Sequence, residues 1–377
     1  MHTGLHNPGN VQATLRGALA VILHPFSACL PIRCRYNHHD TLSSEPQSRI
    51  DPQARIPVLS DFPRLMLFLI LTLLSGPSLA EEKQLAYLVS DQRIPYWDIM
   101  QRGVVERATQ LGYRVTTYSA ENSAKRELEH TAQAIQQGVD GIILSPTNSS
   151  ASVTILKLAQ SARIPVVIAD IGTEGGDYVS YIASDNREGS YQIGRILVKA
   201  LQARNWDQGT VGIISIPQTR ENGRARTAGF MRAMDEAHIR GAGIRQQVDF
   251  SYRETYEFAR QLIEANADLR ALWLQGSDRY QAALDAMADT GRQQQMLLIC
   301  FDAEPEFLEL IPKGVLVGAA MQQPFLMGEA AVNALHEHLQ GGTPQHQTLL
   351  PILAVSKDNI EVLKPQILRN VLGIGEQ

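Results

Sequence analysis

The chain has 377 residues, of which 44% are hydrophobic and 19% are charged, and its formal net charge is −5. This length suggests about two domains, and the composition is that of an ordinary folded protein with a sizeable core. Basic residues are not concentrated in any one segment, which argues against nucleic acid as a partner.

Residues 64–80 have the pattern of a secretory signal peptide. Arg64 precedes an apolar run from Leu65 to Leu74, and helix-breaking and small residues follow up to Ala80. The run is short for a membrane span, although a membrane anchor or a buried helix is the alternative interpretation. We therefore predict export and cleavage after Ala80.

Residues 1–63 do not fit in front of a signal peptide. They contain Pro, Ser, His and Arg without sustained periodicity, so we interpret them as a non-structural upstream extension, with translation beginning near Val58 or Met66. The mature chain would start at Glu81 and keep one cysteine, Cys300. This residue lies in an apolar run and is predicted to pack in the core.

A strand-then-helix pattern repeats along the first half of the mature chain. Apolar runs begin at residues 85, 114, 141, 165 and 179, and amphipathic segments lie at 97–111, 124–137 and 152–162. This spacing fits βα units with right-handed crossovers. The runs are continuously apolar, which indicates a parallel sheet covered on both faces.

The alternation restarts after residue 184. Strands are predicted at 211–216, 245–250, 271–274, 297–301 and 316–320, and helices at 188–201, 225–237, 255–265, 280–290 and 325–339. A closing strand at 349–355 and an amphipathic tail at 360–372, which docks on a lobe, complete the chain. The pattern predicts an α/β fold of two doubly wound parallel-sheet lobes.

We expect the chain to cross between the lobes three times, near residues 184–186, 322–323 and 349–351. The predicted N-terminal lobe is therefore 81–184 plus 323–348. The predicted C-terminal lobe is 185–322 plus 349–377.

Chemistry-bearing side chains recur where predicted strands end. Tyr96 and Trp97 follow the first strand, and polar groups such as Asp170, Asp302 and Gln322 follow later ones. Ligands of parallel sheets bind outside the carboxyl ends of the strands. Each polar residue alone could be a helix N-cap, and the aromatics alone could be loop packing. Their convergence indicates a site for a ligand with hydroxyl groups and a flat apolar face.

The order and spacing of six short motifs resemble the periplasmic sugar-binding proteins of the ribose-binding type, which are receptors for ABC transporters. The motifs are PYW at 95–97, QGVDGIILSP at 137–146, IPVVIAD at 164–170, IASDN at 182–186, RARTAGF at 224–230 and FD at 301–302. The resemblance covers residues 83–356 and implies a type I periplasmic binding protein fold.

The resemblance also implies roles for individual residues. Tyr96 and Trp97 would sandwich a sugar, Asp170 and Asp302 would bind hydroxyl groups, Arg226 would be the binding arginine, Gln322 would be the hinge glutamine, and either Phe250 or Tyr252 would be the aromatic opposite the first pair. The chain departs from the family at Ile171, where an arginine is common, and at Gly276, where an asparagine is expected. These departures suggest a less hydroxylated or larger ligand.

Motifs for catalysis are not visible: there is no Walker A run, no G-x-G-x-x-G and no G-x-S-x-G. We therefore predict a monomeric binding protein without enzymatic activity, cofactor or metal, which delivers a small sugar or polyol to the membrane permease of an ABC transporter. The alternative is a periplasmic sensing subunit that presents its closed form to a sensor kinase or chemoreceptor. A transcription-repressor effector domain is a third reading, disfavoured by the export segment that precedes the domain.

Overall fold

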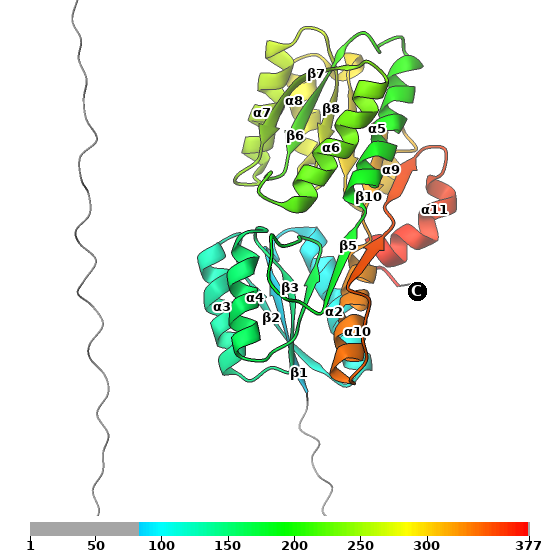
Figure 1. Cartoon of the computed structure of the whole chain (residues 1–377). Coiled ribbons are helices and arrows are strands. Elements are labelled where there is room, and N and C mark those ends of the chain that lie inside the picture. Colours follow the sequence, from blue (N-terminus) through cyan, green and yellow to red (C-terminus); the bar gives the residue numbers. More distant parts are fainter. Residues whose placement is uncertain (1–82, 376–377) are drawn as a thin grey trace, which may run out of the picture. The chain divides into compact units, whose positions relative to one another are not determined.

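The computed structural model describes residues 83–375, which lie within the compact unit Pro77–Gln377. The predicted upstream extension and signal peptide fall outside the described residues. Residues 83–375 form two lobes, each built on a six-stranded sheet (Figure 1).

The first sheet is entirely parallel, with strand order β11-β5-β4-β3-β1-β2. Its strands are β1 (Gln84–Val89), β2 (Arg114–Ser119), β3 (Gly141–Ser145), β4 (Val166–Ala169), β5 (Ser180–Ser184) and β11 (Gln347–Leu350). Its helices are α2 (Pro95–Gln110), α3 (Ala124–Gln136), α4 (Ala151–Ser161) and α10 (Pro324–Leu339). Successive residues of β1 enter different cores: Tyr87 packs with α2 and α10, whereas Leu88 packs with α3 and α4. Helices therefore cover both faces of the sheet, as the continuously apolar strands predict.

The second sheet has strand order β12-β10-β9-β8-β6-β7 and is parallel except for β12, which pairs antiparallel with β10. Its strands are β6 (Thr210–Ser215), β7 (Arg240–Gln246), β8 (Leu269–Leu274), β9 (Leu297–Phe301), β10 (Gly318–Met321) and β12 (Leu353–Ser356). The helices of this lobe are α5 (Asn186–Gln202), α6 (Glu221–Glu236), α7 (Tyr252–Ala265), α8 (Tyr280–Asp289), α9 (Phe307–Leu310) and α11 (Ile360–Gln366), with short helical turns at Gln293–Gln295 and Ile367–Val371. Its core includes Phe230 and Trp273, whose rings stack 3.9 Å apart.

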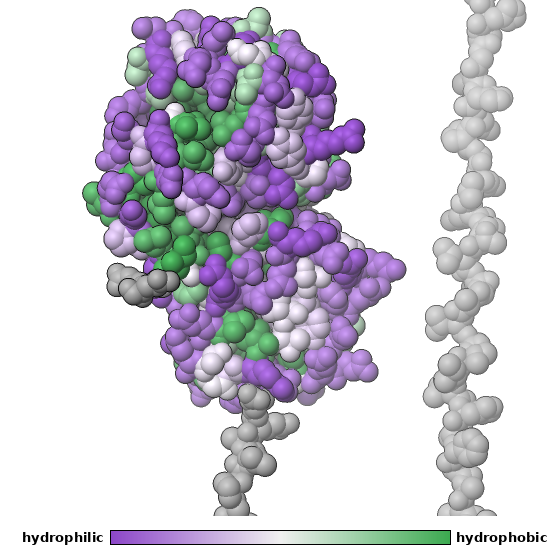
Figure 2. All heavy atoms as spheres, turned by 180° about the vertical axis from the view of Figure 1, so that it is seen from behind, coloured by the Kyte–Doolittle hydropathy of each residue, from purple (hydrophilic) through white to green (hydrophobic). Residues whose placement is uncertain are grey.

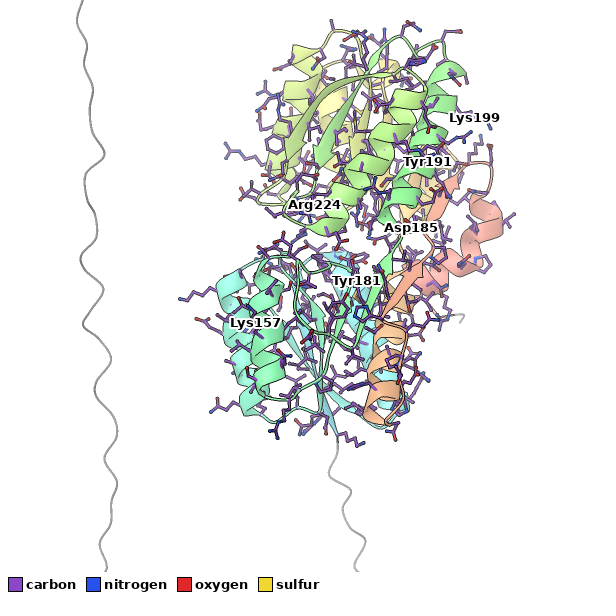
Figure 3. All side chains as sticks on the ribbon, in the orientation of Figure 1. Lys157, Tyr181, Asp185, Tyr191, Lys199 and Arg224 are labelled. Carbon is purple, nitrogen blue, oxygen red and sulfur yellow. The ribbon has the colours of Figure 1, made fainter. Side chains whose placement is uncertain are left out.

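The chain passes between the lobes three times, from β5 to α5, from β10 to α10 and from β11 to β12. At the first crossing Asp185 caps α5 by accepting a hydrogen bond from the backbone N of Glu188 (Figure 3). At the other two, Gln323 Nε2 donates to the carbonyl oxygen of Pro351 at 2.7 Å. The predicted fold class, two α/β lobes joined by a three-crossing hinge, is confirmed.

Two predicted strands are wrong in their extent. The closing strand expected at 349–355 is two strands in different sheets, separated at Pro351, which has no N–H to donate to a ladder. Because β11 ends at Leu350, the first sheet extends two residues beyond the predicted boundary at 348. The strand expected at 245–250 is β7, which runs from residue 240 to 246. It is a solvent-exposed edge strand containing Gly241 and Gly243, so its hydrophobic signal is weak.

The C-terminal tail contacts both lobes. Ile360 and Ile367 are buried in the core of the second lobe. Arg369 forms an ion pair at 2.9 Å with Glu329 of α10, and Arg102 of α2 donates to the carbonyl oxygens of residues 372 and 373. The tail therefore docks on the second lobe, as predicted, and is also tied to two helices of the first.

Exposed apolar residues are scattered over the surface. Val248 follows β7 and Val362 lies on α11, and on the face in Figure 2 hydrophobic residues appear in limited areas between hydrophilic ones. Within residues 83–375 we find no helix with both the length and the apolar character needed to cross a membrane.

Candidate functional site

A cavity of about 50 Å³ lies between the lobes at the carboxyl ends of the strands. All seven site residues predicted from the sequence line it: Tyr96, Trp97, Asp170, Arg226, Phe250, Asp302 and Gln322. Six further residues complete the lining: Ile94, Ile216, Arg220, Asn222, Gly276 and Asp278. Residues of both lobes, some of them more than 200 positions apart in the sequence, therefore meet in one place.

The two adjacent aromatics open α2, whose first residue, Pro95, favours a helix start. The rings of Tyr96 and Trp97 lie edge to face, with centroids 5.0 Å apart. Trp97 is buried in the core of the first lobe, and the Tyr96 hydroxyl donates to Asp170 Oδ1 at 3.1 Å. The aromatic from the second lobe is Phe250, because Tyr252 is 48% exposed and hydrogen-bonds to Asp285.

Asp170 follows β4 and has a φ of 67°, in the left-handed region that Asp tolerates better than most residues. Its carboxylate accepts hydrogen bonds from Tyr96 and, at 3.2 Å, from Asn222 Nδ2 of the other lobe. Burial raises the pKa of Asp170 to about 6, and the positive charge of Arg226 opposes this rise. The residue after it, Ile171, is fully buried in the core of the first lobe.

Asp302 follows β9 in the same left-handed conformation, with a φ of 66°. Gln322 Nε2 donates to its Oδ1 at 2.6 Å, and Arg226 Nη1 lies 3.5 Å from its Oδ2. Burial raises the pKa of Asp302, while Arg226 and the hydrogen bond from Gln322 oppose the rise. The carboxylate is therefore held by one amide and one guanidinium.

Arg226 is buried on α6 and is fixed from several sides. Nε donates to Asn186 Oδ1 at 2.8 Å, and Nη1 donates to the carbonyl oxygen of Gln275 at 2.7 Å. The guanidinium carbon lies 3.8 Å from the ring centroid of Phe301, in a cation–π contact. These contacts hold the Arg226 guanidinium in one position before any ligand binds.

Sequence reasoning missed Arg220, Asn222 and Asp278 as lining residues. The helix after β6 was predicted to begin at residue 225, whereas α6 begins at Glu221. The sequence pattern therefore leaves Arg220 and Asn222 outside every predicted strand and helix. Asp278 follows β8, but nothing in its spacing distinguishes it from a helix cap.

Several buried acceptors near the cavity have no hydrogen-bond donor among the described residues. They include Gln322 Oε1, Gln275 Oε1 and Asp278 Oδ2. Asp278 Oδ2 forms an ion pair with Arg279 Nη1 at 3.1 Å, but the geometry is not that of a hydrogen bond. An unpaired buried acceptor is costly. Gln322 and Asp278 line the cavity, whereas Gln275 does not, so a small molecule that offers O–H or N–H donors would suit the first two acceptors.

Glu127 makes a contribution to the free energy of unfolding that depends on pH. Its carboxylate accepts hydrogen bonds from Thr147 N and Oγ1 at 2.8 and 2.9 Å, and burial raises its pKa to about 7. The folded protein therefore binds the proton of the Glu127 carboxyl more tightly than the unfolded chain does. The resulting stabilisation of the folded protein is fully present below pH 4.5 and is lost as the pH rises through 7. We expect Glu127→Gln to raise the free energy of unfolding at pH 8 by about 3 kcal/mol and to leave it nearly unchanged at pH 4.5.

Urea unfolding at the two pH values measures this difference. Glu129→Gln, which removes a carboxylate from an exposed position on the same helix, is the control. An equal effect of Glu127→Gln at both pH values would contradict the assignment.

Comparison with known proteins identifies the family. A protein-family model described as "Periplasmic binding protein domain" matches residues 85–343. The ribose import binding protein of Bacillus subtilis (strain 168) is 26% identical over 264 residues, covering 70% of this chain and 84% of the relative. A D-ribose/D-allose-binding protein of Pseudomonas aeruginosa is 26% identical over 239 residues, covering 60% and 72%.

A solved structure agrees in fold. It is a carbohydrate transporter solute binding protein from Agrobacterium radiobacter in complex with D-arabinose, with a TM-score of 0.71 and 20% identity, covering 78% of this chain and 99% of that one. The matched family model spans both lobes and all of the residues that line the cavity. The chain belongs to the family of periplasmic binding proteins.

Proposed function

We propose that this protein binds a small sugar or polyol-like ligand between its lobes and carries out no chemistry on it. The observation that supports this most strongly is the lining of the cavity, where the buried carboxylate of Asp170, the partly buried carboxylate of Asp302 and buried amides accompany aromatic rings from both lobes. Carboxylates accept hydrogen bonds from hydroxyl groups, and rings cover the apolar face of a sugar. The relatives named above are described as binding ribose, allose or arabinose.

Ligand entry in this proposal requires the lobes to separate. The cavity of about 50 Å³ is small, because one water molecule occupies about 10–15 Å³ on the same measure. In the present arrangement it therefore has room for only a few non-hydrogen atoms. Three crossings form a hinge about which two rigid lobes can rotate. We propose that the rotating bodies are 81–184 plus 323–348 and 185–322 plus 349–377, apart from the strand β11, which pairs with β5 to its end.

Titration calorimetry with D-ribose, D-allose and D-arabinose tests the proposal. Binding of at least one of them is the expected result, and Asp302→Ala should weaken it about ten- to a hundredfold, since a hydrogen bond to a charged group contributes about 1.5–3 kcal/mol. Asp235→Ala, at an exposed position of the same lobe, is the control. Unchanged affinity in a folded Asp302→Ala protein with a lowered melting temperature would mean that Asp302 is only structural.

We further propose that the protein acts as a monomer in the periplasm and delivers its ligand to the permease of an ABC transporter. The alternative partner is a membrane sensor that reads the closed form. Neighbouring genes for a permease and an ATPase would support transport, and a neighbouring kinase gene would support sensing.

Export carries its own prediction. N-terminal sequencing of the protein recovered from the periplasm should begin at Glu81. A mature protein that retains residues 65–74 would contradict cleavage at this site.

A further inference from the structure

Three consecutive residues at the start of α6 connect the second lobe to the first. Arg220 Nε donates to the carbonyl oxygen of Thr147 at 3.1 Å, and its Nη2 donates to Ser90 Oγ at 3.2 Å and to Asn122 Oδ1 at 2.9 Å. Two more hydrogen bonds follow, from Glu221 N to Ser149 Oγ at 3.1 Å and from Asn222 Nδ2 to Asp170 Oδ2 at 3.2 Å. We call residues 220–222 and these five hydrogen bonds the clasp.

The clasp reaches the carboxyl ends of four strands of the first sheet. Ser90 follows β1, Asn122 follows β2, Thr147 follows β3 and Asp170 follows β4. Arg220 is only 6% exposed, and burial lowers its pKa to about 10, so it remains charged at neutral pH. Its hydrogen-bond acceptors are all neutral oxygens, and the nearby carboxylates of Asp170, Glu127 and Asp91 attract its charge and oppose the fall in its pKa.

The position of the clasp gives it leverage over the hinge. The crossings lie beside β5 and β11 in one sheet and β10 and β12 in the other, at one edge of each sheet. The clasp spans from α6, which follows β6 beside the far edge strand β7, to residues at the ends of β1, β2 and β3. Opening about the hinge separates this far side most, so it must break these hydrogen bonds.

We propose that Arg220 is a positioning residue that sets the equilibrium between open and closed lobes, independently of which ligand is bound. Four of the five hydrogen bonds end on Ser90, Asn122, Thr147 or Ser149, which do not line the cavity, so closed complexes with different ligands gain the same stabilisation from these four. The fifth ends on Asp170, which does line the cavity. Apparent affinity falls in proportion to the population of the binding-competent form. This inference rests on the proposed function only where affinity is measured.

The first test needs no ligand. Spin labels at Lys125→Cys and Arg253→Cys report the separation of the lobes, because both positions are exposed and lie at helix starts that follow the far edge strands β2 and β7. Cys29→Ser and Cys34→Ser confine labelling to these sites, and Cys300 is fully buried. We expect a short-distance component in the parent protein, its loss in Arg220→Gln, and its retention in Arg224→Gln, whose side chain is exposed four residues along α6 (Figure 3).

A second variant separates the clasp from the cavity lining. Arg220 lines the cavity, whereas Asn122 does not. Asn122→Gly removes the acceptor side chain and suits the φ of 60° at this position. It should also reduce the short-distance component, and it should add little when combined with Arg220→Gln, because both substitutions break one interaction.

Affinity provides the third readout. Arg220→Gln should raise the dissociation constants for D-ribose and D-allose by the same factor, about ten- to a hundredfold. Factors that differ more than about fivefold between the sugars, with an unchanged distance distribution, would make Arg220 a ligand contact and overturn the proposal. Absence of the short-distance component in the parent protein, or its persistence in both clasp variants, would also overturn it. If neither sugar binds the parent protein, the proposed ligand class fails while the distance measurements still test the clasp.

Discussion

Arg226→Ala is expected to destabilise the second lobe and to reduce ligand affinity more than a hundredfold. The substitution removes the donors to Asn186 Oδ1 and to the carbonyl oxygen of Gln275, and it leaves Asp302 with Gln322 as its remaining partner. Removing one member of a buried ion pair costs about 3–5 kcal/mol, because the other charge stays buried. Urea unfolding and titration calorimetry with D-ribose measure the two effects.

The controls for this experiment lie on the same helix. Arg224→Ala deletes an exposed guanidinium that donates to the carbonyl oxygen of Gln218, so it should change neither quantity by much. Arg226→Lys keeps the charge but loses the planar fork that serves three acceptors, and we expect it to be intermediate. An Arg226→Ala protein that unfolds at the same urea concentration as the parent would show that these contacts do not stabilise the lobe.

Gly103→Ala should destabilise the first lobe although alanine is the better helix former. A Cβ atom at this position would overlap the carbonyl oxygen of Phe325, and a Cβ on Gly328 would overlap that of Met100. The backbones of α2 and α10 therefore touch at paired glycines. Overpacking of this kind costs about 1–3 kcal/mol, against a propensity gain of about 1 kcal/mol.

A lower melting temperature of Gly103→Ala checks this prediction. Because Tyr96 lies on α2 and its hydroxyl is 3.8 Å from Met327 Sδ on α10, separating the helices should also weaken ligand binding. Gly175→Ala is the matched control, since a Cβ there meets no atom within 4 Å. Equal melting temperatures for Gly103→Ala and the parent would mean that the helices separate at no cost.

The residues around the cavity differ in how far sequence could predict them. Asp170 and Asp302 each follow an uninterrupted apolar strand, so the general rule for parallel sheets was enough to direct both to one edge. Ile94 also lines the cavity, but an isoleucine before a helix reads as core. Arg220 could not be predicted, because its partners follow three strands of the other lobe, and its distance from them depends on closure of the lobes.

Edge strands explain the remaining errors in the fold. Central strands of both sheets are buried on two faces and carry continuous apolar runs, which located them well. β7 is exposed, contains two glycines and pairs irregularly with β6 near Gly212, so neither its pattern nor its length was visible. β11 and β12 are four residues each, and they are separated by Pro351 and by their pairing in different sheets.

The three crossings determine the order in which the molecule can fold. Met327 and Leu335 of α10 fill the core that Tyr87 of β1 also enters, and β11 forms the edge of the first sheet. The lobe whose strands are synthesised first therefore lacks a covering helix and an edge strand until residue 350 has been made. A growing chain that contains only β1 to β5 exposes an unfinished core, so the first lobe is not an independent folding unit. The first sheet is complete only once β11 has been made and the second only once β12 has been made, so the two lobes reach completion together.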